Sequence, residues 1–220
     1  MDRREAIRRV TILMGGAVVG ANLFLGGCTR PITKTVEVLF EESNIDLLNE
    51  LAEAILPRTS TPGAGDANVG SFIPVMIRDC YSEADQKAFV DGLKEIDNCA
   101  KRDFGRRFQD LTKEERFAFV DAQDREAKVF QDNRKAELKL VEEKLKKEGG
   151  KEMNRFAFKK KMDNIKEDTA NHFFTLLKQL TLTGYFTSEV GMTKALRFVK
   201  VPGKFDGDYP YSKGERAWAI

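Results

Sequence analysis

One stretch of the chain, from Lys113 to Glu148, contains neither proline nor glycine. Charged residues dominate it, and Glu-to-Lys pairs fall at helical spacing in the segment KAELKLVEEKLKKE. Thr112 and Glu115 form a capping box at its start, and Gly149-Gly150 marks its end. Acids and bases alternate, which argues against a basic binding surface. The pattern predicts one long helix that forms half of a charged helical hairpin. Its apolar series is Phe117, Val120, Ala127, Val129, Leu138, Val141 and Leu145.

The segment before this helix also has helical periodicity. Ser43 is a suitable N-cap for a helix that Pro57 ends, and a loop rich in turn-forming residues follows. A short helix is expected from about Ser71. Ser82 with Asp85 resembles a second capping box, although aspartate replaces the usual glutamate. The expected fold is therefore mostly α.

After the hairpin turn, a second long helix is expected from about Met153 to Leu182. Residues 184–220 then change character, because glycines and prolines interrupt them. An irregular tail with many aromatic residues must pack either on its own domain or on a partner. We expect a single helical domain that ends in this tail. The tail's aromatic residues are Tyr185, Phe186, Phe198, Phe205, Tyr209, Tyr211 and Trp218.

The first residues of the chain resemble an export signal. Arginine pairs that include Arg3 and Arg4 precede a short apolar stretch diluted by glycines, and Leu-Gly-Gly-Cys ends at Cys28. This pattern favours a cleaved twin-arginine lipoprotein signal over a retained membrane helix, with Cys28 as the lipidated residue. Ala6 departs from the usual twin-arginine pattern. We therefore expect a signal at 1–27, a tether at 28–42 and the helical domain at 43–220, with a charged elongation at about 113–165.

Composition excludes several classes of function. The net charge is +2, and the signal contributes much of the basic excess, so a nucleic-acid partner is not expected. No spacing of cysteine and histidine predicts a metal site or a c-type haem. Cys80 and Cys99 either form a disulfide or remain thiols, and the sequence does not decide between them.

The sequence also lacks a convincing catalytic constellation. His172 is the single histidine, and its place before two phenylalanines on a helix favours a structural role. Neither a dinucleotide-binding fingerprint nor a Gly-x-Ser-x-Gly nucleophile elbow occurs in the expected domain.

Three segments together resemble a known family. They are the segment Ala54–Ala64 (AILPRTSTPGA), the segment Phe173–Glu189 (FFTLLKQLTLTGYFTSE), and Val201-Pro202-Gly203 with a terminal Ala217-Trp218. With the twin-arginine start, they are similar to the gluconate 2-dehydrogenase subunit 3 family, the small subunits of periplasmic sugar or polyol dehydrogenases. The resemblance covers most of the mature chain except about 124–165.

The resemblance implies an accessory role. In such complexes a large subunit of the glucose-methanol-choline (GMC) oxidoreductase type holds FAD and the catalytic residues, and electrons pass to a cytochrome c or another acceptor. The small subunit carries the export signal for both chains. This chain would then hold no cofactor and would lie in the periplasm or cell envelope, tethered to a membrane surface. The substrate stays open among gluconate, glucose and glycosides, with a slight preference for glycoside 3-dehydrogenases.

Two regions are the candidates for contact with the large subunit: the loop from Arg58 to Gly63 and the segment from Tyr185 to Glu189. The aromatic residues of the tail, including Trp218, would support this contact. The alternatives are that the loop residues only shape a turn, and that Glu189 only caps or pairs internally. An independent helical envelope lipoprotein and a self-sufficient enzyme that uses His172 are the competing hypotheses. The candidate contact residues are Arg58, Thr59, Thr61, Pro62, Gly63, Tyr185, Phe186, Thr187, Ser188, Glu189 and Trp218.

Overall fold

The computed structural model describes residues 34–149, 155–201, 203, 207–210 and 212–219. The expected export signal with Arg3, Arg4 and Cys28 lies outside these residues, as do Gly150 in the expected turn and the tail residues Phe205 and Tyr211. The prediction of a mostly α domain is confirmed. The elements are α2 (Lys34–Glu37), η1 (Val38–Phe40), α3 (Glu42–Ile55), α4 (Val69–Cys80), α5 (Glu83–Phe104), η2 (Phe108–Asp110), α6 (Lys113–Gly149), α7 (Arg155–Asp168), α8 (Phe173–Thr187) and the π-helical turn η3 (Gly191–Ala195).

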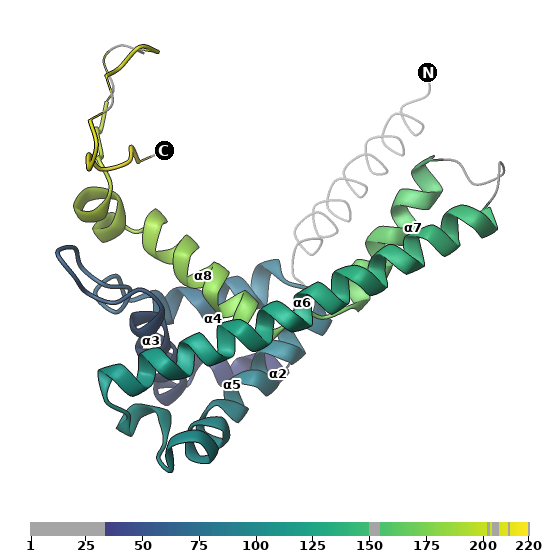
Figure 1. The fold of residues 1–220 in the computed structure, drawn as a ribbon, viewed down its shortest axis with the longest axis horizontal. Helices are drawn as coiled ribbons and strands as arrows, with labels where there is room; N and C mark the ends of the chain where they lie inside the picture. Colours follow the sequence, from purple (N-terminus) through teal and green to yellow (C-terminus); the bar gives the residue numbers. More distant parts are fainter. Residues whose placement is uncertain (1–33, 150–154, 202, 204–206, 211, 220) are drawn as a thin grey trace, which may run out of the picture. The chain divides into compact units, whose positions relative to one another are not determined.

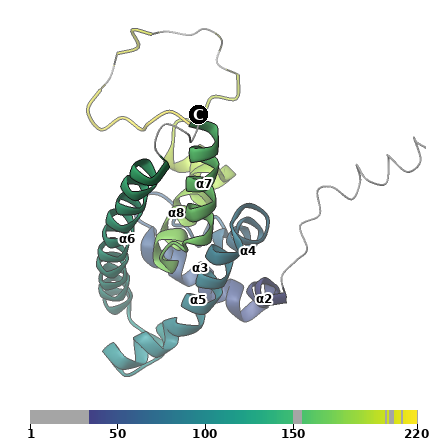
Figure 2. The ribbon, with the colours of Figure 1, turned by 90° about the vertical axis from the view of Figure 1, so that its right-hand side faces the viewer.

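Helix α8 is the centre of the core. It packs against α3, α4, α5 and α6 (Figure 1 and Figure 2). A helix that is apolar around most of its circumference must be buried, and α8 has this composition. Gly92 on α5 permits its close approach, because a Cβ there would lie 2.3 Å from the Phe173 side chain. Its buried residues are Phe173, Phe174, Leu176, Leu177, Leu180, Thr181, Gly184 and Tyr185.

Helix α6 begins at the capping box that the sequence predicts. The Glu115 N–H donates to Thr112 Oγ1 at 3.3 Å, and the Thr112 N–H donates to Glu115 Oε2 at 2.8 Å. The predicted apolar series was wrong in part, because it mixed two faces of the helix. Phe117 is 65% exposed and Val129 is 62% exposed. Phe119, absent from the series, is buried instead, with its ring 5.3 Å from that of Phe108.

The second long helix is divided in two, which corrects the prediction of one helix from 153 to 182. Residues between Asp168 and Phe173 are not helical, because two polar side chains accept hydrogen bonds from backbone N–H groups at this break. Asp85 on α5 accepts the Asn171 N–H at 2.7 Å. His172 is the N-cap of α8, and its Nδ1 accepts the Phe174 N–H at 3.2 Å. The break lets α8 turn into the core while α7 stays on α6.

The domain begins earlier than the sequence suggests. Residues 34–40, expected within the tether, are helical, and Val36 and Leu39 are fully buried in the core. Ser43 lies inside α3, whose N-cap is Glu41 without a side-chain cap. The preceding turn is held instead by Asn44, whose Nδ2 donates to the Val38 carbonyl at 2.8 Å.

Within the described residues, no helix combines the length and the apolar character needed to cross a membrane. Cys80 ends α4 and Cys99 lies on α5, and both are free thiols.

Candidate functional site

The structure joins the two candidate regions. The loop between α3 and α4, residues 56–68, is here called the α3–α4 loop. Tyr185 near the end of α8 donates its hydroxyl to the Pro62 carbonyl in this loop at 2.6 Å. Tyr185 is only 2% exposed, so its ring belongs to the core while its hydroxyl reaches the loop. Segments more than a hundred residues apart in the sequence therefore form one site.

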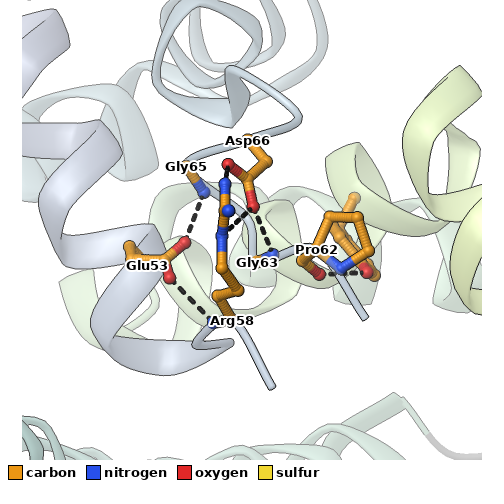
Figure 3. A network of polar contacts seen from close by, with 7 residues as sticks. Glu53, Arg58, Pro62, Gly63, Gly65 and Asp66 are labelled. Carbon is orange, nitrogen blue, oxygen red and sulfur yellow. Dashed lines mark hydrogen bonds and ion pairs between the residues drawn. The ribbon is translucent and has the colours of Figure 1, made fainter. Parts of the chain in front are cut away.

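Glu53, in the last turn of α3, organises the loop from inside (Figure 3). Its Oε1 accepts the Arg58 N–H at 2.8 Å, and its Oε2 accepts the Gly65 N–H at 2.9 Å. One carboxylate thus closes both ends of the loop. Hydrogen bonds to an ionised acceptor are stronger than neutral ones, so this arrangement fixes the loop conformation.

Gly63 provides the space for this carboxylate. A Cβ at position 63 would lie 2.2 Å from Glu53 Oε2 and 2.6 Å from its Cδ. The φ angle of Gly63 is not in the left-handed region, so the backbone itself would accept alanine. The requirement for glycine here is therefore steric.

Asp66 fixes the Arg58 side chain (Figure 3). Its carboxylate accepts Arg58 Nε–H at 2.9 Å, pairs with Arg58 Nη2, and accepts the Gly63 N–H at 2.9 Å. The Arg58 hydrogen bond, followed by that of Gly63, lowers the pKa of Asp66. The Arg58 side chain stays 68% exposed, so the pair orients the guanidinium at the surface without burying it.

The candidate residues divide into exposed and structural ones. Arg58 and Thr59 are exposed in the loop, whereas Thr61 and Pro62 are half-buried and Gly63 is buried. At the end of α8, Phe186 is 39% exposed, and Thr187 and Glu189 are also exposed. Ser188 is structural, because its Oγ donates to the Tyr185 carbonyl at 2.7 Å and accepts the Gly191 N–H at 3.0 Å.

The family comparison covers both regions. The family described as gluconate 2-dehydrogenase subunit 3 matches residues 42–203. The chain belongs to this family. It is thus a small subunit of a gluconate 2-dehydrogenase-type complex, and the family implies association with a dehydrogenase large subunit. The comparisons with curated proteins and with solved structures found no similar chain.

Trp218 lies beyond the residues that the family matches. Its contacts differ from those of the candidate residues in the α3–α4 loop and at the end of α8. Its ring stacks on Arg197 and meets the edge of Tyr209. The structure therefore places Trp218 in a separate cluster within the tail.

An open cavity of about 350 Å³ lies beside the α3–α4 loop of the small subunit. Backbone N–H groups bind Glu53, and Arg58 binds Asp66. Arg116 Nη2 lies 3.1 Å from Glu50 Oε2, which is buried and accepts no hydrogen bond from the described residues. Burial raises the pKa of Glu50, and Arg116 opposes this effect. The cavity is thus lined by carboxylates that each face a cation or backbone N–H groups. The lining residues are Asn49, Glu50, Glu53, Arg58, Gly65, Asp66 and Arg116.

His172 has a structural role in the small subunit. Its Nδ1 accepts the Phe174 N–H, so this nitrogen cannot serve as a base while the cap is formed. Its ring lies 5.3 Å from that of Phe130, and burial lowers its pKa. Among the described residues, no group of three or more histidine, cysteine or acidic side chains is arranged to hold a metal ion.

Glu53 and Asp66 are the site residues that sequence reasoning missed. Glu53 carried a signal, because an acid in the last turn of a helix is unfavourable next to the helix dipole unless it has another partner. Asp66 follows two glycines in a turn-rich segment, where short acidic side chains often bind nearby backbone.

Proposed function

We propose that this small subunit binds, stabilises and co-exports an FAD-containing GMC-type dehydrogenase large subunit. One observation carries the proposal: the α3–α4 loop and the end of α8, both within the family match, are fixed to each other by Tyr185 and Pro62. A surface built from two distant segments and held by buried groups suits recognition of a partner.

The exposed residues of this surface fit a protein interface. Arginine and aromatic residues are enriched at interfaces, and here Arg58 and Phe186 both reach solvent. Asp66 holds the guanidinium in one orientation, and Glu53 fixes the backbone below it. A surface ordered before binding loses less conformational entropy on association. Thr59, Thr187 and Glu189 supply polar groups around these two anchors.

The export part of the proposal rests on the first residues of the chain. FAD is loaded in the cytoplasm, and only a route for folded proteins keeps it bound during export. Arg3 and Arg4 address the complex to that route, and Cys28 carries the lipid that holds it at the membrane surface of the envelope. The large subunit oxidises a sugar or glycoside there and passes electrons to a cytochrome c or another acceptor.

Association is tested with the double variant Arg58→Ala/Phe186→Ala. We expect the affinity for the flavoprotein large subunit to fall at least about tenfold, since central arginine and aromatic anchors commonly carry this much. The matched control is Arg125→Ala/Phe117→Ala on α6, which removes an exposed arginine and an exposed phenylalanine elsewhere. The measurement is biolayer interferometry with the purified flavoprotein. An equal loss of affinity in the two double variants would refute the proposed interface.

Export is tested by Arg3→Lys/Arg4→Lys in the natural host. We expect both subunits to stay in the cytoplasm, with dehydrogenase activity lost from the periplasmic fraction. Normal export of the large subunit would contradict the co-export proposal. If the tagged wild-type chain instead purifies colourless and alone, the independent lipoprotein hypothesis replaces this proposal.

A further inference from the structure

Four residues of the C-terminal tail form a defined cluster, here called the Arg197 cluster: Arg197, Tyr209, Glu215 and Trp218. The Arg197 guanidinium lies 4.2 Å from the centre of the Trp218 ring and 5.0 Å from that of Tyr209. The two rings meet edge to face at 5.5 Å. Arg197 Nη1 also pairs with Glu215 at 2.6 Å. The Arg197 side chain thus contacts two aromatic rings and one carboxylate.

Backbone hydrogen bonds close the tail at the same place. The Arg197 N–H donates to the Ala217 carbonyl at 2.8 Å, and the Ala219 N–H donates to the Arg197 carbonyl at 3.0 Å. The chain therefore leaves at Arg197 and returns beside it at Trp218.

Apolar side chains next to the cluster are exposed. Phe198 is 46% exposed, Val199 45% and Val201 76%, and the Trp218 ring in the cluster is 47% exposed. We call Phe198, Val199 and Val201 the apolar segment. Exposed apolar side chains that are contiguous on a surface commonly mark a site of interaction with another molecule.

The position of the apolar segment favours one occupant. The preceding turn η3 is joined to the end of α8, since the Gly191 N–H donates to Ser188 Oγ and the Leu196 N–H to the Gly191 carbonyl. The segment therefore continues directly from the surface assigned above to the large subunit, and the family match extends through it to residue 203. The tail carries both signs of charge rather than the cluster of basic residues that attracts anionic membranes. Its basic residues are Arg197, Lys200, Lys204, Lys213 and Arg216, and its acidic residues are Asp206, Asp208 and Glu215.

We propose that the Arg197 cluster positions the apolar segment and the Trp218 ring for docking into an apolar depression of the dehydrogenase large subunit. This proposal rests on the proposed function, and adds a second, independently organised contact to it. Arg197 is the positioning residue, while the apolar segment and the Trp218 ring make the contact.

The test compares two double variants of the full chain. Phe198→Ser/Val199→Ser removes two apolar contacts and leaves the Arg197 cluster intact. The control is Phe117→Ser/Val129→Ser, which removes the same two residue types from α6, where both side chains are more exposed than Phe198 and Val199. We expect the first variant to weaken binding of the purified flavoprotein at least about tenfold and the control to leave it unchanged. Thermal unfolding of each free variant shows whether the helical domain is intact.

Arg197 separates positioning from contact. Arg197→Gln keeps every apolar side chain but removes the ion pair and the stacked cation, so we expect a smaller loss than in Phe198→Ser/Val199→Ser. Arg197→Lys keeps the charge but loses the planar group, so we expect partial recovery. A variant Arg197→Gln with wild-type affinity would exclude the positioning role.

The outcomes distinguish this proposal from the proposed function. If the wild-type chain binds no flavoprotein, the proposed function itself is wrong. If it binds and Phe198→Ser/Val199→Ser binds equally well, only the docking proposal is overturned. Two further results would overturn the docking proposal, provided that the affinity of Phe198→Ser/Val199→Ser for the flavoprotein is unchanged. One is that this variant no longer self-associates, and the other is that it no longer binds phosphatidylglycerol vesicles. The apolar segment would then serve a second copy of the chain or the membrane.

Discussion

The contact between Glu53 and Gly63 makes a quantitative prediction. Glu53→Ala removes two hydrogen bonds from backbone N–H groups to a carboxylate, those of Arg58 and Gly65. Bonds of this kind contribute about 1.5–3 kcal/mol each when buried. The adjoining cavity admits water, which replaces part of this, so we take the loss as about 2–3 kcal/mol. Removing an acid from the C-terminal end of the helix dipole stabilises the chain by about 0.3–1 kcal/mol, which leaves a net loss of about 1–3 kcal/mol.

Gly63→Ala is expected to have nearly the same effect for a different reason. Its Cβ displaces the flexible Glu53 carboxylate rather than any backbone atom, so the same two hydrogen bonds are lost. The reduced freedom of the unfolded chain offsets about 0.4–1 kcal/mol of this loss. In the Glu53→Ala background no carboxylate remains to be displaced. There, Gly63→Ala is expected to stabilise the chain by about 0.5 kcal/mol, so the sign of its effect reverses.

The four proteins of this cycle are compared by urea unfolding followed by circular dichroism, with the midpoint and slope measured for each. Gly65→Ala is a useful control, because its Cβ would lie 3.1 Å from Glu53 Oε2 and needs only a small shift of the carboxylate. Equal destabilisation by Gly63→Ala in both backgrounds would refute the steric explanation. It would mean that the backbone around position 63, not Glu53, requires glycine.

Three further predictions concern single groups. Burial lowers the pKa of His172, so the unfolded chain takes up a proton more readily, and stability should fall as the pH drops below about 6.5; His172→Asn keeps an N-cap and should flatten this dependence in unfolding curves measured across that range. Tyr185→Phe should lower the free energy of unfolding by about 0.5–1.5 kcal/mol, and hydrogen exchange should quicken in the α3–α4 loop, whereas exposed Tyr209→Phe should not affect that loop. Thr112→Ala should cost about 1 kcal/mol, and Thr112→Ser should restore most of it, as measured by thermal unfolding.

Features set by local chemistry could be predicted from the sequence. The long helix α6 follows from a stretch without proline or glycine, and its start follows from the reciprocal pair Thr112 and Glu115. The end of α3 before Pro57 and the N-cap at Ser82 depend likewise on residues only a few positions apart. Such signals are present in any short window of the chain, so no knowledge of the tertiary fold is needed.

Features set by distant contacts could not be predicted in this way. The break between α7 and α8 depends on Asp85, which binds Asn171 across 86 positions. The apolar series of α6 failed because only the packed neighbour Phe108 determines that Phe119, and not Phe117, faces inward. The two candidate regions were predicted separately from their resemblance to the family. The hydrogen bond from Tyr185 to Pro62 that joins these regions was not predicted.

The bond between Tyr185 and Pro62 also couples binding to stability. Tyr185 belongs to the most buried helix, and its hydroxyl holds the loop that carries Arg58. A partner that binds only the ordered loop must therefore favour the packed state of α8, because binding to the native state raises its stability. Binding of the large subunit then stabilises the packed helix α8, and the packed helix strengthens binding, since linkage between binding and folding is reciprocal. Tyr185→Phe would weaken this coupling without removing any exposed contact. The affinity of the variant for the large subunit should fall by no more than the free energy needed to order the loop again.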